Sequence, residues 1–299
     1  MARTKILIAV DDPSWASIIV QTLFNLLNRE NTEIILLNVL ETTLVDEEYF
    51  YSYPERYIKH ESRKGNFAYV ENLLEKNNFE YQFIFKEGDA AENIINMSKK
   101  LGVDMLVVGS HNKKIFETFF LGSVAYKVSR LCRCSVMIVS SKYHVHNIRK
   151  KKFNVLLAVD SSEASRIAAE NLSGLIDVKR AKIDVLNVTV PPEKVIPAEA
   201  YVYTDVERLI EESKQVSKEL LDNIENILKS KEPIEINKVS IAGDPSSKIV
   251  NYAEKNSIDL IVMGPRAKRD FSPLFLGGTS IKVTEKSEIP LLLVKKEKI

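Results

Sequence analysis

The sequence predicts an α/β protein of two tandem, doubly wound domains, each built on a five-stranded parallel sheet. Three observations support this: an internal repeat, short aliphatic runs that alternate with helical patterns, and a pair of glycine-bearing turns late in each copy. Continuous aliphatic runs are typical of strands that are covered on both faces. Their alternation with helices favours parallel strands joined by right-handed crossovers.

The internal repeat sets the domain boundaries. The segment 5–11, KILIAVD, returns as 154–160, NVLLAVD, 149 positions later, and 36–39, LLNV, returns as 185–188, VLNV, at the same offset. The later glycine turns are offset by 155, so copy two carries six extra residues in one connection. We therefore expect domains at 1–143 and 150–299, joined by a polar, basic linker near 140–152.

Each copy has the same expected order of elements, read from the period of its apolar residues. Copy one is expected to have strands near 5–10, 34–39, 81–86, 104–108 and 135–139, and helices near 14–29, 56–77, 90–101 and 122–131. Copy two is expected to have strands near 154–159, 182–188, 235–241, 259–263 and 290–294, and helices near 162–176, 204–230, 245–256 and 277–286.

The last strand of each copy is apolar and is expected to lie at an edge of its sheet. These strands read SVMIV at 135–139 and PLLLV at 290–294, and both are apolar. A bare apolar sheet edge invites unwanted pairing with other chains. We therefore predict that the two last strands pair with each other between the domains.

Several chain-distant residues are expected to meet at one end of each sheet. Asp11, Val39, Gly109 and Gly122 all lie at or just past the ends of predicted strands or at the start of a helix. Open parallel sheets bind ligands beyond the carboxyl ends of their strands, at the point where strand order reverses. The first N–H groups of a helix lack internal partners and favour an anion such as phosphate.

Composition excludes several other classes of protein. The formal charge of +1 gives no general attraction to nucleic acid or an anionic membrane, and no apolar run is long enough to span a bilayer. The first ten residues read as a strand rather than a signal peptide. Cys132 and Cys134 are one residue apart and read as inert small residues in a reducing, cytoplasmic compartment. The four histidines are scattered, so no metal site is expected.

The glycine turns carry a resemblance to a known family. Copy one reads Gly109-x2-Asn112-x9-Gly122-Ser123, and copy two reads Gly264-x2-Ala267-x9-Gly277-Gly278. This spacing, with phrases such as AVDDPSWAS and FLGSVAYKV, resembles the tandem form of the universal stress protein (UspA-like) family, whose nucleotide-binding branch has the signature G-x2-G-x9-G-[ST]. The resemblance implies an adenine nucleotide alpha hydrolase-like fold that binds ATP, or another adenine nucleotide, with Mg²⁺.

The resemblance also implies which residues bind the nucleotide. The aspartate after the first strand would contact ribose or adenine, the valine of the second strand would offer backbone groups to adenine, and the glycine signature would wrap the phosphates. The expected residues are Ala9, Asp11, Val39, Val108, Gly109, His111, Asn112, Gly122, Ser123 and Val124 in copy one, and Asp160, Val188, Met263, Gly264, Arg266, Gly277, Gly278 and Thr279 in copy two. The alternative for Asp11 and Asp160 is that each caps the helix that follows.

Both copies depart from the signature at its second glycine. Asn112 tolerates a left-handed backbone better than most residues, whereas Ala267 should cost about 1–2 kcal/mol if that conformation is kept. Pro265 removes an N–H donor, and Gly278 lacks the hydroxyl that Ser123 supplies in copy one. We therefore expect nucleotide binding chiefly in copy one.

Three functions remain open on the sequence. The first is a nucleotide-binding module in stress adaptation, acting through a protein partner and possible homodimers; the second is a scaffold with degenerate pockets; the third is a weak ATPase. A conventional enzyme is not expected, because the sequence has neither a G-x-G-x-x-G after the first strand nor a P-loop, and no acid–base set recurs in both copies. No catalytic residue is assigned.

Overall fold

The structure is a computed structural model that describes residues 3–41, 67–110, 122–140, 142–143, 151–194, 196, 205–265 and 277–295. The strands of copy one are β1 (Thr4–Ala9), β2 (Thr32–Leu40), β3 (Glu80–Glu87), β4 (Met105–Ser110) and β5 (Ser135–Ser140). Those of copy two are β6 (Phe153–Val159), β7 (Ala181–Thr189), β8 (Glu235–Ala242), β9 (Leu260–Met263) and β10 (Leu291–Leu293). The helices are α1 (Pro13–Leu26), α3 (Ala68–Lys76), α4 (Ala90–Leu101) and α5 (Ser123–Leu131), then α6 (Glu163–Leu175), α7 (Val206–Lys229), α8 (Pro245–Lys255) and α9 (Gly278–Lys286).

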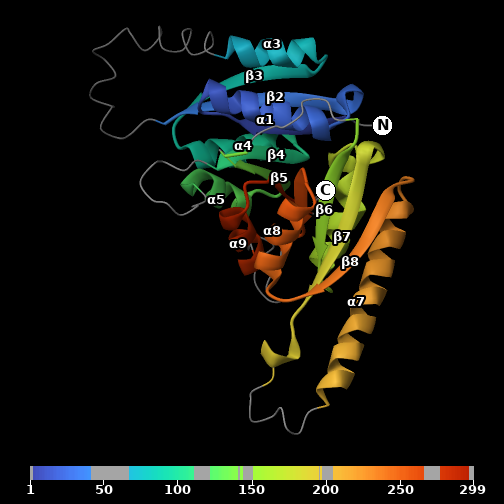
Figure 1. Ribbon diagram of the computed structural model, residues 1–299. Coiled ribbons are helices and arrows are strands. Elements are labelled where there is room, and N and C mark those ends of the chain that lie inside the picture. The colour runs from blue at the N-terminus through green and yellow to red at the C-terminus, as the bar shows by residue number, and fades with distance from the viewer. Residues whose placement is uncertain are drawn as a thin grey trace, which may run out of the picture.

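The ten strands of the described residues form one sheet, in the order β3-β2-β1-β4-β5-β10-β9-β6-β7-β8. Within each copy the neighbouring strands are parallel, and the two halves mirror each other across the middle of the sheet. The β5–β10 pair is antiparallel, with Leu292 opposite Met137. This pairing confirms the predicted α/β fold class and the predicted contact between the last strands. We call the β5–β10 pair the joint. Figure 1 shows the sheet running from β3, past β5 and β6, to β8.

Helices cover both faces of this sheet, which explains why its central strands are apolar throughout. One buried cluster joins α1, α3, α6 and α7 to one face, and a second joins α4, α5, α8 and α9 to the other. Each cluster includes residues from both copies, so the two halves share their cores along the sheet. Strands covered on both faces lose the alternation of polar and apolar residues.

Short polar side chains fix where several helices begin. The aspartates Asp12, Asp89, Asp205 and Asp244 are the N-caps of α1, α4, α7 and α8, and each accepts a hydrogen bond from a backbone N–H of the first turn. Such caps satisfy N–H groups that have no partner inside the helix.

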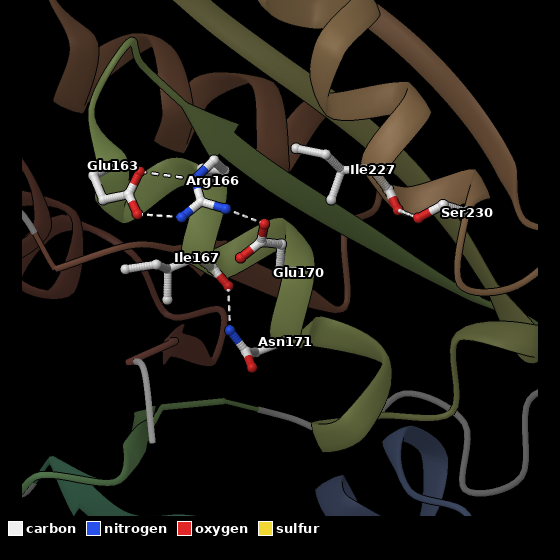
Figure 2. A network of polar contacts seen from close by, with 7 residues as sticks. All are labelled: Glu163, Arg166, Ile167, Glu170, Asn171, Ile227 and Ser230. Atoms are coloured by element: carbon white, nitrogen blue, oxygen red, sulfur yellow. Dashed lines mark hydrogen bonds and ion pairs between the residues drawn. The ribbon is translucent and has the colours of Figure 1, made fainter. Parts of the chain in front are cut away.

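The outer face of α6 carries a chain of ionic contacts. Arg166 pairs with Glu163 one turn before it and with Glu170 one turn after it, and Asn171 donates to the carbonyl of Ile167 at 2.8 Å (Figure 2). All of these residues lie three or four positions apart, where helical side chains meet. Exposed pairs of this kind contribute little to stability. They mark this face of α6 as solvated, whereas its opposite face packs on the sheet.

The predicted elements agree with the structure to within a few residues at most ends. The exception is the helix predicted near 56–77: α3 covers 68–76, and residues 42–66 lie outside the described part of the chain. The division into domains at 1–143 and 150–299 stays a prediction, because one continuous sheet and shared cores do not show two separate folding units.

Candidate functional site

The site expected in copy one lies at the carboxyl ends of β1 and β4, where the order of strands reverses. Since β1 and β4 pair Ile8 with Val107, Gly109 lies level with the end of β1, next to Asp11. On the other side, β1 and β2 pair Ala9 with Leu37, which brings Val39 to the same edge. The structure thus brings together the predicted residues Ala9, Asp11, Val39, Val108 and Gly109. His111 and Asn112 lie outside the described residues.

Helix α5 begins at this site with its first amides available. Gly122 is its N-cap, and no side chain of the described residues caps it. The Tyr126 N–H is the first that bonds within the helix, to Gly122 at 2.8 Å. The preceding amides, those of Ser123, Val124 and Ala125, have no acceptor within the helix. Ser123 is exposed, so its hydroxyl and N–H can both reach an anion.

Of the two neighbouring aspartates before α1, only the second caps the helix. Asp12, rather than Asp11, caps the helix: its carboxylate accepts from the N–H groups of Ser14 at 2.9 Å and Trp15 at 3.2 Å. The alternative that Asp11 is the cap is therefore wrong. Asp11 is exposed, two residues past the end of β1.

The matching aspartate of copy two is used differently. Asp160 Oδ1 accepts from the Ser162 N–H at 3.0 Å, from the Ser162 hydroxyl, and from the Ser165 hydroxyl at 2.9 Å. It therefore braces the turn between β6 and α6, although the structure assigns the N-cap to Ser162. These internal bonds compete with any contact between Asp160 and a ligand.

The first glycine of the signature is needed for close packing, which differs from its expected role in a turn. Gly109 lies within β4, and a Cβ there would come within 1.7 Å of the Trp15 Nε1 atom. In copy two, a Cβ on Gly264 would come within 2.2 Å of the Ala164 carbonyl oxygen. Both glycines therefore let the first turn of a helix approach the end of a central strand. Trp15 is 6% exposed and lies against Gly109, the first glycine of the signature.

Copy two repeats the geometry in weaker form. Met263 ends β9, Gly264 follows it, and Val188 reaches the same edge in β7. Helix α9 begins at the N-cap Gly277 without a side-chain cap among the described residues, so Gly278 and Thr279 offer amides as α5 does. Arg266 and Ala267 lie outside the described residues.

Sequence reasoning missed the residues that hold each site in shape. The buried amide of Asn38 donates to the Val10 carbonyl at 2.7 Å, and Asn187 donates to the Val159 carbonyl at 2.8 Å. Both bonds pin the chain after the first strand to the second strand. The signal was present, because the Leu-Asn-Val triplet recurs in both copies.

Comparison with known proteins settles the family. The sequence profile of the universal stress protein family matches twice, over residues 2–140 and 153–295. The chain belongs to the universal stress protein family. It is a tandem member, since each copy accounts for one match.

Individual relatives agree with this assignment. Universal stress protein YxiE of Bacillus subtilis is 29% identical over 144 residues, which cover 45% of this chain and 97% of the relative. Universal stress protein MJ0577 of Methanocaldococcus jannaschii is 27% identical over 153 residues, which cover 48% of this chain and 94% of the relative. The crystal structure of a universal stress protein from Archaeoglobus fulgidus covers 99% of this chain and 97% of its own with a TM-score of 0.67 at 20% identity, which shows a shared fold.

The described residues also bear on membrane and metal sites. Within the ranges described above, no helix is both long and apolar enough to cross a membrane. Among the same residues, no three side chains of the metal-ligating types gather closely enough to hold an ion.

Proposed function

We propose that this universal stress protein binds an adenine nucleotide, ATP with Mg²⁺, in the copy-one cleft between Asp11, Gly109 and Gly122. The observation that carries the proposal is the start of α5. A nine-residue helix begins there with a glycine N-cap, next to the strand ends where parallel sheets bind ligands. A polyphosphate would supply the acceptors that the first amides lack.

The two aspartates at the end of β1 support the same cleft. Asp12 caps α1, and Asp11 is exposed at the edge where a ribose hydroxyl could donate to it. In copy two the equivalent carboxylate already accepts three hydrogen bonds. These bonds compete with a ligand for Asp160, and together with Pro265, Ala267 and Gly278 they favour binding in copy one.

The output of binding is proposed to be conformational rather than catalytic. Within the described residues of the cleft, the side chains offer an exposed carboxylate and a serine hydroxyl, and no neighbouring group is placed to act as a base on a nucleotide. Membership of the universal stress protein family supports a role in the stress response. We propose a cytoplasmic protein that signals through a protein partner or a homodimer.

Calorimetry with matched glycine variants tests the proposal. Mg-ATP titrated into protein at about 100 µM should release heat, since affinities in the micromolar range are then well resolved. Gly122→Val should abolish that heat, because a branched side chain would occupy the space in front of the α5 amides. Gly277→Val, the same change in copy two, should leave binding intact.

The outcomes separate the competing functions. No heat with the wild-type chain would remove the nucleotide-binding proposal and favour the scaffold. Normal binding by Gly122→Val, with loss in Gly277→Val, would move the site to copy two. Circular dichroism of both variants controls for misfolding. Phosphate release above the protein-free rate would favour a weak ATPase.

A further inference from the structure

The chain's two cysteines lie together at the joint between the two copies. Cys132 ends α5 as its C-cap, and Cys134 immediately precedes β5, the strand that pairs with β10. Both thiols are free and buried, one residue separates them in the chain, and each shifts the pKa of the other. The sequence alone favours inert small residues here, but the contacts of this pair indicate chemistry.

A buried lysine from the other copy reaches this turn. Lys295 lies just past β10, and its Nζ donates to the carbonyls of Ser129 at 2.8 Å and Cys132 at 2.6 Å. Its backbone N–H donates to the Ser135 hydroxyl at 3.2 Å. Lys295 is 8% exposed, so its charge acts on the thiols through protein rather than through water.

The surroundings of Cys132 favour its thiolate. The hydrogen bond with Cys134 acts most strongly, and the Ser98 hydroxyl, 3.5 Å from the sulfur, and the Lys295 charge add to it. Together they outweigh burial and lower the pKa of the Cys132 thiol to about 7. The same hydrogen bond and burial raise the pKa of Cys134, so the pair contains one nucleophile and one proton-bearing partner.

The equivalent turn of copy two, between α9 and β10, has no cysteine. Its α9–β10 turn has Ser287 and Ile289 at the positions of the two cysteines, and the Ser287 hydroxyl accepts from the Ile289 N–H at 3.1 Å. A hydroxyl therefore suffices to close the turn. The thiol pair of copy one is not required by the fold.

We propose that Cys132 and Cys134 form a redox-active dithiol that a hydroperoxide oxidises to an intramolecular disulfide. The Cys132 thiolate attacks the terminal peroxide oxygen, the O–O bond breaks, and the leaving oxygen takes up the proton that Cys132 has lost. Cys134 then attacks the sulfenic sulfur, the S–O bond breaks, and hydroxide leaves with the Cys134 proton as water. Two thiols lose two electrons, and the peroxide is reduced by two.

Access to the buried pair comes from its place at the end of a helix. Cys132 is 1% exposed and Cys134 is 8% exposed, but Leu131, the residue before them, is 47% exposed. Helix ends open locally far more often than the core does. Hydrogen peroxide is close to water in size, so fraying of the last turn of α5 admits it.

The test treats the full chain with excess hydrogen peroxide and follows its mass. The expected product has lost two hydrogen atoms, shows a Cys132–Cys134 link in the peptide map, and returns to the starting mass with dithiothreitol. In Cys134→Ser, dimedone should trap a sulfenic acid at Cys132, whereas Cys132→Ser should show little adduct at Cys134. Both changes are nearly isosteric, and circular dichroism checks that the variants fold.

Variants of Lys295 test whether its charge, and not only its packing, promotes disulfide formation. Lys295→Met should slow disulfide formation about three- to tenfold by raising the thiol pKa, whereas Lys295→Arg should retain most of the rate. The proposal is overturned if the wild-type chain keeps both thiols while glutathione in the same tube is oxidised. Equal dimedone labelling of the two single variants would overturn the assignment of Cys132 as the nucleophile.

Discussion

At the scale of single residues, the two copies differ most in how they use the aspartates after their first strands. Copy one has Asp11 followed by Asp12, so one carboxylate can cap α1 while the other stays exposed. Copy two has Asp160 followed by Ser161, and its single carboxylate braces the turn. The residue that follows the first aspartate therefore changes how each copy holds the start of its next helix.

Because Asp12 caps α1 and Asp11 does not, substituting Asp12 should affect stability, whereas substituting Asp11 should affect ligand binding. Asp12→Ala should lower the free energy of unfolding by about 0.5–2 kcal/mol, because an N-cap is lost. Asp11→Ala should change it by less than about 0.5 kcal/mol, as exposed substitutions usually do, while weakening Mg-ATP binding. Urea unfolding and calorimetry on both variants measure the two effects. A stability loss in Asp11→Ala equal to that in Asp12→Ala would contradict this difference in roles.

At the scale of elements, the joint between β5 and β10 carries the connection between the copies. Its strands are short, and Leu292 and Met137 face each other fully buried at the middle of the pair. Lys295 adds bonds from the end of copy two to the α5–β5 turn of copy one. The joint thus combines strand pairing, apolar packing and one buried charge.

Shortening a buried side chain at the joint should lower the free energy of unfolding far more than shortening an exposed side chain nearby. Leu292→Ala should lower the free energy of unfolding by about 2–5 kcal/mol, because it removes buried contacts and leaves a cavity between the copies. Leu131→Ala, at the exposed end of α5, should cost less than about 0.5 kcal/mol. Chemical denaturation measures both. Equal losses would show that the joint is not a packed core.

The strands and their pairing at the joint could be predicted from the sequence, whereas the contacts that shape the candidate site could not. Continuous aliphatic runs predicted the strands, and the apolar edges SVMIV and PLLLV predicted the joint, because each signal is local. The reason for Gly109 was not predictable, because the group it makes room for, the Trp15 indole, is far away in the chain. The same holds for Lys295, whose partners Ser129 and Cys132 belong to the other copy.

At the scale of the whole molecule, the chain is two copies of one unit built into a single sheet. Their cores are continuous across the joint on both faces, which makes the tandem chain resemble a dimer fused end to end. We expect each copy to fold alone, with domains at 1–143 and 150–299. Separation would leave β5 and β10 as bare apolar edges.

Splitting the chain tests this view of the molecule. The fragment 1–143 alone should form a dimer through its β5 edge, because antiparallel pairing of two β5 strands mimics the β5–β10 joint. Mixing it with the fragment 150–299 should convert it to a one-to-one complex that restores the native joint. Light scattering coupled to size exclusion reads both masses. A folded fragment 1–143 that stays monomeric would contradict the role assigned to the joint.

The most direct test of the central claim, nucleotide binding in copy one, uses the chain's single tryptophan. Trp15 packs against Gly109 at the proposed copy-one site, so its emission reports on that site and not on copy two. Titration with Mg-ATP should change the emission to saturation in the wild-type chain and in Gly277→Val, and should leave it unchanged in Gly122→Val. Emission that stays flat in the wild-type chain, or that changes equally in Gly122→Val, would contradict the account.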